Sequence, residues 1–151
     1  MISLLVLDVD GVLTNGAVLL DAEGRESKTL FARDVDAVFA ARRAGVRVAL
    51  LTGEATPLVD VIARRLEIDV VWVGRKDKDA AIAELASELE VPLEAVCYVG
   101  DAVRDAPALA LVGLGLAPAD AAQAARDAAD RVLEAPGGRG AVEEAVALVL
   151  G

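Results

Sequence analysis

Short apolar runs alternate with longer amphipathic stretches along most of the chain. The apolar runs have the length and the Val, Leu and Ile content of buried strands, and the longer stretches have helical spacing. This alternation is typical of successive βα units around a parallel sheet. It predicts core strands at 3–8, 46–51, 69–73, 96–99 and 113–116, with a further candidate at 130–133, and helices at 34–44, 56–66, 78–90, 104–111, 119–128 and 140–150.

One segment breaks the alternation directly after the first strand. Residues 16–20 and 27–31 have β-like patterns and flank the turn-forming DAEG at 21–24. The pattern predicts a β-hairpin that stands over the C-terminal edge of the sheet like a flap. Farther along, APGGRG at 135–140 predicts a mobile loop near the C-terminus.

The fold class that follows is α/β, a Rossmann-like three-layer sandwich with a central parallel sheet. The 151 residues predict a single domain, 1–151, and a composition that is 56% hydrophobic and only 3% aromatic predicts an aliphatic core. Only about fifteen residues separate the first strand end from the first core helix, which leaves no room for a cap domain.

Charge and composition exclude several classes of function. A net charge of -10 argues against nucleic-acid binding and means that an anionic ligand needs local positive charge. With no histidine in the chain, acid-base chemistry falls to carboxylates, lysine, the cysteine or a metal-bound water. No apolar run is long enough to span a bilayer and no secretory signal is visible, so we expect no membrane association and a cytoplasmic location. The lone Cys97 lies in an apolar run and is expected in the core.

Polar side chains suited to a metal or a phosphate follow four of the predicted strands. Two aspartates two residues apart at the first strand end repel each other, and a bound divalent cation would offset that repulsion. The carboxyl ends of parallel strands meet at one edge, where ligands bind in open α/β sheets. The residues concerned are Asp8 and Asp10, Thr52 and Gly53, Lys76 and Lys78, and Asp101 and Asp105.

These residues, in this order, resemble the four motifs of the haloacid dehalogenase superfamily of phosphohydrolases. The matching stretches are DVDGVLT at 8–14, LLTG at 50–53, Lys78, and GDAVRD at 100–105. Each stretch alone is commonly a turn, a helix cap or a solvated side chain, but four in order at strand ends are far more specific. FARD at 31–34 and GGRGAV at 137–142 further resemble the uncapped phosphatases of the 3-deoxy-D-manno-octulosonate 8-phosphate type.

The resemblance implies a phosphatase that depends on Mg²⁺ and forms an aspartyl-phosphate. Asp8 would be the nucleophile, and Asp8, the backbone carbonyl of Asp10, and Asp101 would hold the metal. Asp10 would donate a proton to the leaving alcohol and later accept one from water. Thr52 and the N–H of Gly53 would hold phosphoryl oxygens.

The lysine assigned by the same resemblance is Lys78, which would place a positive charge beside Asp8 and the phosphate. Lys76, two positions earlier, is a rival for this role. Asp105 would orient Lys78 or a metal-bound water.

The chain departs from the pattern of this family at positions that concern the metal and the substrate. Close relatives carry a second aspartate where this chain has Ala102, so weaker or altered magnesium affinity is expected. The related nononate phosphatases carry a glutamate at the position of Glu54, whereas Arg139 matches the octulosonate enzymes. Both substrates therefore stay open. Arg139 is a candidate for contact with a sugar-acid carboxylate or a solvated loop residue.

Arg33 and Asp34 are further candidates for substrate contact, with a surface ion pair as the alternative. The substrate class that the resemblance implies is a small phosphorylated sugar acid. Relatives of this type form homotetramers that close the open site, and a homotetramer with Val18, Leu19 and Leu20 in its contacts is expected here. The alternatives are a degenerate sugar-phosphate-binding or accessory subunit, and a receiver-like phosphoacceptor domain.

Overall fold

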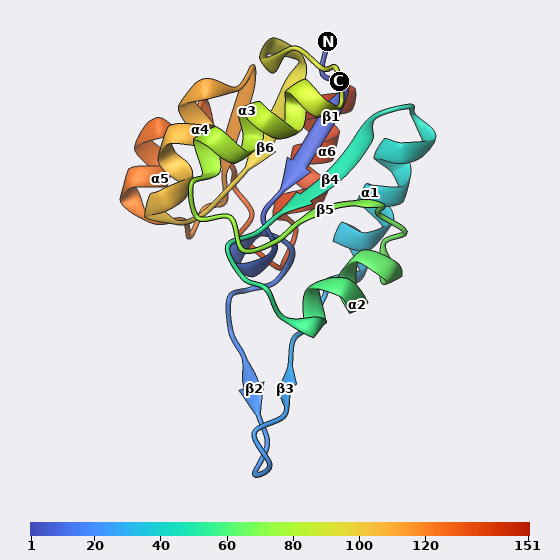
Figure 1. Cartoon of the computed structure of the whole chain (residues 1–151), viewed down its shortest axis with the longest axis vertical. Coiled ribbons are helices and arrows are strands. Elements are labelled where there is room, and N and C mark those ends of the chain that lie inside the picture. The colour runs from blue at the N-terminus through green and yellow to red at the C-terminus, as the bar shows by residue number, and fades with distance from the viewer.

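The computed structural model describes residues 1–151 as one α/β unit with a projecting hairpin (Figure 1). The chain has eight strands and six α-helices, which alternate from α1 onward. The strands are β1 (Leu4–Leu7), β2 (Leu19–Leu20), β3 (Glu26–Ser27), β4 (Arg47–Leu51), β5 (Val70–Trp72), β6 (Val96–Val99), β7 (Leu114–Ala117) and β8 (Arg131–Val132). The helices are α1 (Ala32–Arg43), α2 (Pro57–Arg65), α3 (Lys78–Glu88), α4 (Ala106–Leu111), α5 (Gln123–Ala128) and α6 (Ala141–Leu150).

Six of the strands form one parallel sheet in the order β5-β4-β1-β6-β7-β8. Counted along the chain, this is the 3-2-1-4-5-6 order of doubly wound nucleotide-binding sheets. The strand order reverses beside β1, between β4 and β6. The carboxyl ends of these three strands are therefore where a ligand is expected to bind.

Helices cover both faces of the sheet (Figure 1). Leu5 and Leu7 of β1 belong to one core cluster with residues of α1, α2 and α6, while Leu4 and Val6 belong to another with residues of α3, α4 and α5. Successive strand residues point to opposite faces, so a strand buried on both sides must be apolar throughout. This explains the unbroken apolar run before the first aspartate.

The predicted elements are present with small changes at their ends. All six core strands form, including the candidate at 130–133, although β8 is only two residues long. The helix expected at 104–111 begins with a tight turn at Val103–Asp105, and the one expected at 119–128 starts later, at Gln123. Cys97 is buried in β6, as predicted. No helix combines the length and the apolar character needed to cross a bilayer.

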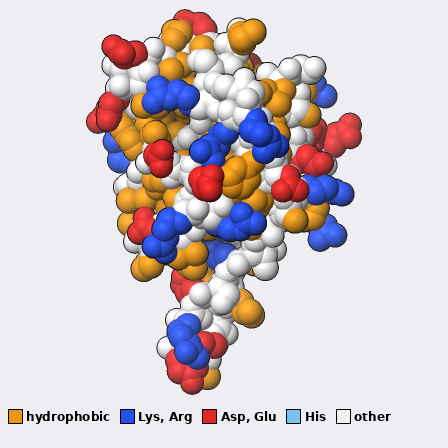
Figure 2. Space-filling view, turned by 90° about the vertical axis from the view of Figure 1, so that its right-hand side faces the viewer, with side chains coloured by type: hydrophobic (Ala, Val, Ile, Leu, Met, Phe, Trp, Pro, Cys, Tyr) orange, Lys and Arg blue, Asp and Glu red, His pale blue; other side chains and the backbone are white.

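The hairpin forms where it was expected, but its paired strands are shorter. β2 and β3 pair over two residues each, and the Asp21 carboxylate accepts hydrogen bonds from the backbone N–H groups of Glu23 and Arg25 in the turn. The hairpin projects away from the body instead of folding over the sheet edge (Figure 1). Hydrophobic side chains lie exposed along it and charged ones at its tip (Figure 2).

The segment at 135–140, expected as a mobile loop, is anchored on several sides. The N–H of Gly138 donates to the Val12 carbonyl at 2.9 Å, and that of Gly137 donates to the Asp120 carboxylate at 3.0 Å. The buried Asp34 carboxylate accepts from the N–H groups of Gly140 and Glu143 at 3.2 and 2.9 Å. Asp34 therefore caps the start of α6, and the expectation that it contacts substrate is wrong.

Candidate active site

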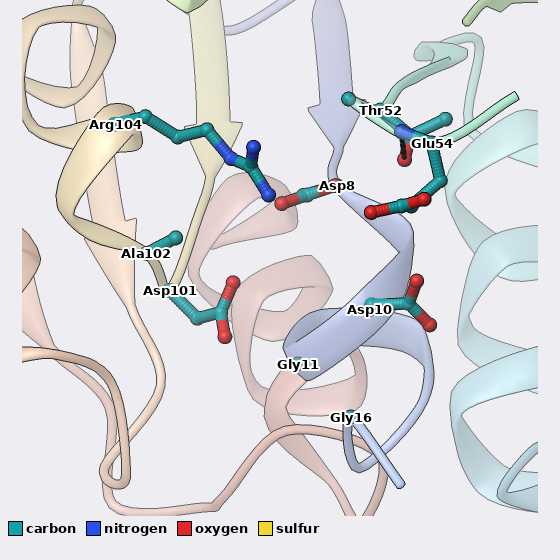
Figure 3. Close-up of a pocket in the computed structure, with 10 residues that line it drawn as sticks. Asp8, Asp10, Gly11, Gly16, Thr52, Glu54, Asp101, Ala102 and Arg104 are labelled. Atoms are coloured by element: carbon teal, nitrogen blue, oxygen red, sulfur yellow. Dashed lines mark hydrogen bonds between the residues drawn. The ribbon is translucent and has the colours of Figure 1, made fainter. Parts of the chain in front are cut away.

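A cavity of about 210 Å³ lies at the carboxyl ends of β1, β4 and β6, where strand order reverses. Its charged lining residues come from all three strand ends (Figure 3). They are Asp8, Asp10, Glu54, Asp101 and Arg104, with Thr52 and Gly53 between them. The structure thus gathers in one pocket residues that are nearly a hundred positions apart in the chain.

A tight helical turn at Val9–Leu13 brings β1 close to the end of β6. The Thr14 N–H closes this turn on the Val9 carbonyl at 3.0 Å, and Gly11 has a φ of 83°. A Cβ atom at Gly11 would collide with the Asp101 carboxylate. Glycine is needed here both for the left-handed backbone and for the close approach of the two acidic segments.

Asp8 lies at the floor of the pocket and is only 6% exposed. Its carboxylate accepts a 2.7 Å hydrogen bond from the Val9 N–H and lies 3.3 Å from Nζ of Lys78. Burial raises the pKa of Asp8 to about 7, although Lys78 pulls in the opposite direction. A buried carboxylate with a single lysine partner is only partly compensated, and a cation would complete the compensation.

Lys78 is buried at the first position of α3 and is held by three polar groups. Its Nζ lies 2.8 Å from Asp105, 3.1 Å from the Tyr98 hydroxyl and 3.3 Å from Asp8. The rival Lys76 is exposed and makes no such contacts. The structure therefore puts Lys78, and not Lys76, beside Asp8.

Both carboxylate oxygens of Asp105 accept hydrogen bonds from neighbouring groups. One oxygen accepts from Lys78 and from the Tyr98 hydroxyl, and the other accepts from the N–H groups of Asp101 and Ala102 at 3.0 and 2.8 Å. Burial alone would raise the pKa of Asp105, but Lys78 and these hydrogen bonds hold it below its ordinary value. Asp105 is therefore an ionised carboxylate that orients Lys78.

Oxygen atoms from Asp8, Asp101 and Asp105 lie within 4.8 Å of one another. Asp105 is saturated by hydrogen bonds, which leaves Asp8 and Asp101 as the carboxylates free to hold a metal. Burial and the negative charge of Asp105 raise the pKa of Asp101 to about 6. Carboxylate oxygens that repel each other in one pocket are the ligands that hard divalent cations prefer, so the donor set fits Mg²⁺.

Asp10 faces the hairpin side of the pocket. Nζ of Lys28, from the end of the hairpin, lies 2.8 and 2.9 Å from its two carboxylate oxygens, and the Thr14 hydroxyl donates to it at 3.1 Å. The Lys28 side chain is only 6% exposed and that of Asp10 31%, so this ion pair is partly shielded from water. The hairpin thus fixes the orientation of a carboxylate that lines the pocket.

Thr52 and Gly53 line the opposite wall, directly after β4. Thr52 is buried, and its hydroxyl oxygen accepts from the Glu54 N–H at 3.1 Å, which leaves the hydroxyl proton free to donate into the pocket. Glu54 is exposed and enters the pocket across from Arg104 (Figure 3).

The structure does not bring Arg33 and Arg139 into this pocket. Arg33 forms a surface ion pair with Glu143 at 3.1 Å, and not with Asp34 as the alternative from the sequence had it. Both guanidinium groups lie near the Phe31 ring, at 4.9 Å for Arg33 and 5.7 Å for Arg139. Within a single chain, neither residue reaches the carboxylates at the strand ends.

Three polar residues of the site were missed by the sequence analysis. Lys28 and Tyr98 contact their partners across 18 and 7 positions of the chain, and nothing in the local pattern marks them. Arg104 lies inside the GDAVRD motif and could have been found there, because it follows Asp101 at the same strand end.

Comparison with known proteins agrees with this site. Residues 18–113 match the family described as haloacid dehalogenase-like hydrolase. The chain is 38% identical over 149 residues to the 3-deoxy-D-manno-octulosonate 8-phosphate phosphatase of Escherichia coli, covering 99% of this chain and 79% of that protein.

Solved structures of related phosphatases and hydrolases are also similar to this chain. The corresponding Moraxella catarrhalis phosphatase, crystallised with magnesium, phosphate and KDO, superposes with a TM-score of 0.95 at 32% identity, covering 99% of this chain and 86% of that one. A HAD family hydrolase from Streptomyces avermitilis superposes with a TM-score of 0.92 at 39% identity, covering 99% and 91%. The chain therefore belongs to the haloacid dehalogenase-like hydrolase family and is a phosphatase of the uncapped, octulosonate 8-phosphate phosphatase-like group.

Proposed function

We propose that this phosphatase hydrolyses the phosphate monoester of a 3-deoxy-2-keto sugar acid, of the octulosonate 8-phosphate or nononate 9-phosphate type, with Mg²⁺ as cofactor. The observation that carries the proposal is the position of Asp8, which lies 3.3 Å from Nζ of Lys78 and has a carboxylate oxygen within 4.8 Å of one from Asp101. The relatives named above support the substrate class, because the Moraxella enzyme was crystallised with KDO and phosphate.

In the first step, the Asp8 carboxylate attacks phosphorus, and the bond from phosphorus to the sugar oxygen breaks. Asp10, in its protonated form, gives that proton to the leaving oxygen, and Lys28 pairs with the carboxylate that this step leaves. Lys78 stabilises the charge that develops on the phosphoryl group. Magnesium held by Asp8, Asp101 and the Asp10 carbonyl would neutralise the phosphoryl oxygens. The product of this step is an aspartyl-phosphate at residue 8.

In the second step, water attacks the phosphorus of the aspartyl-phosphate and Asp10 accepts its proton. The Asp8 carboxylate is released together with inorganic phosphate. Throughout both steps, the Thr52 hydroxyl and the Gly53 N–H would hold phosphoryl oxygens, and Asp105 would keep Lys78 in place. These roles follow from the family motifs and are proposals for this chain.

Two alternatives are less well supported. A receiver domain has a different strand order, with its phosphorylated aspartate after the third strand, whereas the acidic pair here follows β1. A degenerate binding subunit was suggested by Ala102, but every other polar residue that the catalytic motifs require is retained in the pocket or in contact with it.

The substrate proposal is tested with a panel of sugar-acid phosphates, assayed for released phosphate with and without Mg²⁺. We expect turnover of at least one of the two sugar acids in the presence of Mg²⁺ and none with chelator. Because Glu54 lines the pocket and Arg139 does not, Glu54→Arg is expected to change the ratio of kcat/KM between the two substrates about tenfold, and Arg139→Gln less. Hydrolysis of neither sugar acid would refute the substrate class.

Magnesium should stabilise the protein more at high pH than at low pH. Burial raises the pKa of Asp8 to about 7 and that of Asp101 to about 6, so ionisation of these groups opposes folding. Their contribution to stability is complete below their unfolded pKa near 4 and is lost as the pH rises through these folded values. Magnesium binds the ionised forms, so at about a hundredfold excess over Kd we expect Tm to rise by about 5–10 °C near pH 8.

Near pH 5 the same magnesium concentration is expected to raise Tm much less, because both carboxyls are then largely protonated. Differential scanning calorimetry with and without Mg²⁺ measures both values. An equal rise at the two pH values would contradict binding by Asp8 and Asp101.

We also propose a homotetramer, as the family resemblance implies, and the exposed hairpin supports contact between subunits. Val18, Leu19 and Leu20 are 45%, 72% and 62% exposed on a projecting segment that would be unstable if left bare. The cytoplasmic location stays a prediction from the sequence.

A further inference from the structure

The pocket has an uneven balance of charge among the side chains that line it. Four carboxylates face it, from Asp8, Asp10, Glu54 and Asp101, and only one cation, Arg104, is among the lining residues. Lys78 contributes from beneath, but its charge is shared between Asp8 and Asp105. Lys28 pairs with Asp10, and a bound Mg²⁺ would add two positive charges, but a phosphate monoester brings nearly two negative charges of its own, so a negative excess remains that a further cation on the open side would reduce.

Arg104 is free to supply that charge. It makes no salt bridge, whereas Lys28, Arg33, Arg75 and Lys78 are each paired. Its guanidinium extends from the end of β6 across the pocket toward Asp8, opposite Glu54 (Figure 3). A cation left unpaired beside several carboxylates is available to a ligand without first breaking a protein contact.

The guanidinium of Arg104 lies close to Gly53, which indicates the group that Arg104 would bind. A Cβ atom placed on Gly53 would lie 3.4 Å from both Cζ and Nη1 of Arg104. The guanidinium therefore lies beside Cα of Gly53, the residue whose N–H, in the proposed function, holds a phosphoryl oxygen, and Cγ of the exposed Lys76 lies 3.5 Å from the same point. A group bound there would contact the Gly53 N–H and Arg104 together.

Ala102 makes room for this arrangement. Ala102 also lines the pocket, two residues before Arg104, and its methyl group carries no charge. A carboxylate at position 102 would offer Arg104 an acidic partner within the same turn. With alanine there, the nearest acidic residue in the same turn is Asp105, whose oxygens are already occupied by Lys78, Tyr98 and two backbone N–H groups.

We propose that Arg104 binds a non-bridging oxygen of the phosphoryl group, as an additional phosphate-binding residue of this site. This rests on the proposed function, because it requires the phosphoryl group to lie between Asp8 and Gly53. Guanidinium groups bind phosphate through two parallel N–H bonds, which an ammonium cannot reproduce. The same guanidinium could instead meet the carboxylate of the sugar acid, and the test separates these two contacts.

The probe is inorganic phosphate, titrated calorimetrically into the Mg²⁺-loaded protein. Arg104→Gln is expected to weaken phosphate binding about tenfold or more, which is the loss of one charge-assisted contact, and Arg104→Lys to recover part of it. Mg²⁺ affinity, measured without phosphate, should change little. Arg126→Gln changes an exposed arginine of α5 that does not line the pocket; it is the matched control and should bind phosphate as the wild type does.

Substrate kinetics supply the second readout. If Arg104 contacts phosphate, kcat/KM falls by a similar factor for a sugar-acid phosphate and for an alkyl phosphate without a carboxylate. An unchanged phosphate affinity in Arg104→Gln, or a loss confined to substrates that carry a carboxylate, would overturn the proposal. Failure of the wild type to bind phosphate or hydrolyse any phosphomonoester would instead count against the proposed function.

Discussion

Asp8→Asn is expected to lower turnover by about four orders of magnitude or more on every phosphomonoester, because an amide cannot attack phosphorus. The loss should appear in kcat and not in folding. Burial raises the pKa of Asp8 to about 7, so a neutral amide at this position removes a desolvation cost in the metal-free protein. We expect the free energy of unfolding of Asp8→Asn, without metal, to equal or exceed that of the wild type near pH 8.

The matched control for this variant is Asp36→Asn, which makes the same substitution at an exposed aspartate of α1. Its kcat/KM should stay within about twofold of the wild type, since isolated surface changes have small effects. Activity is measured as released phosphate, and unfolding by urea titration. Turnover by Asp8→Asn within a hundredfold of the wild type would be incompatible with a nucleophilic role for Asp8.

Lys78→Met is the second change with a large expected effect, and it acts on both activity and stability. Removing the ammonium leaves Asp8 and Asp105 as buried carboxylates without a cationic partner. Breaking a buried ion pair from one side costs about 3–5 kcal/mol of stability. Loss of a preorganised positive charge beside the reacting group is expected to lower kcat by about 100–1,000-fold in the fraction that stays folded.

Lys76→Met is the control, because it removes the same kind of side chain two positions earlier from an exposed site. It should unfold like the wild type, with kcat changed by about threefold at most. Lys78→Arg, which keeps the charge, separates folding from chemistry if the methionine variant is too unstable to assay. A larger loss of kcat in Lys76→Met than in Lys78→Met would show that the wrong lysine has been assigned.

The layered fold was accessible from the sequence because burial on both faces leaves a local pattern. β1 and β6 are unbroken apolar runs, β4 is apolar after its first residue Arg47, and each is followed by polar residues of the site. Element ends were less predictable. The last predicted strand shrinks to the two residues of β8, since its ends depend on pairing with β7 and not on its own composition.

The acidic and threonine residues of the site were predictable for a geometric reason. In a parallel sheet every strand ends at the same edge, so residues that follow strands meet there whatever their separation in the chain. Lys78 needed the family resemblance, because a lysine at a helix start is commonly solvated. Its burial is decided by Asp8, Tyr98 and Asp105, which come from other elements.

The errors concern residues whose partners lie far away in sequence. Asp34 was a candidate for substrate contact or a surface ion pair, but it caps a helix that begins more than a hundred residues later. Lys28 belongs to a hairpin that reads as an independent flap, yet its ammonium binds Asp10. Neither contact has a local signature, because each depends on which elements the fold brings side by side.

The most direct test of the account is to trap the proposed intermediate. The wild-type protein with Mg²⁺ and a sugar-acid phosphate is quenched within one turnover, reduced with borohydride and digested for peptide mass spectrometry. An acyl phosphate on residue 8 predicts homoserine at that position, absent without substrate and absent in Asp8→Asn. Product formed at the normal rate with no modification at residue 8, or with the modification at Asp10, would contradict attack by Asp8.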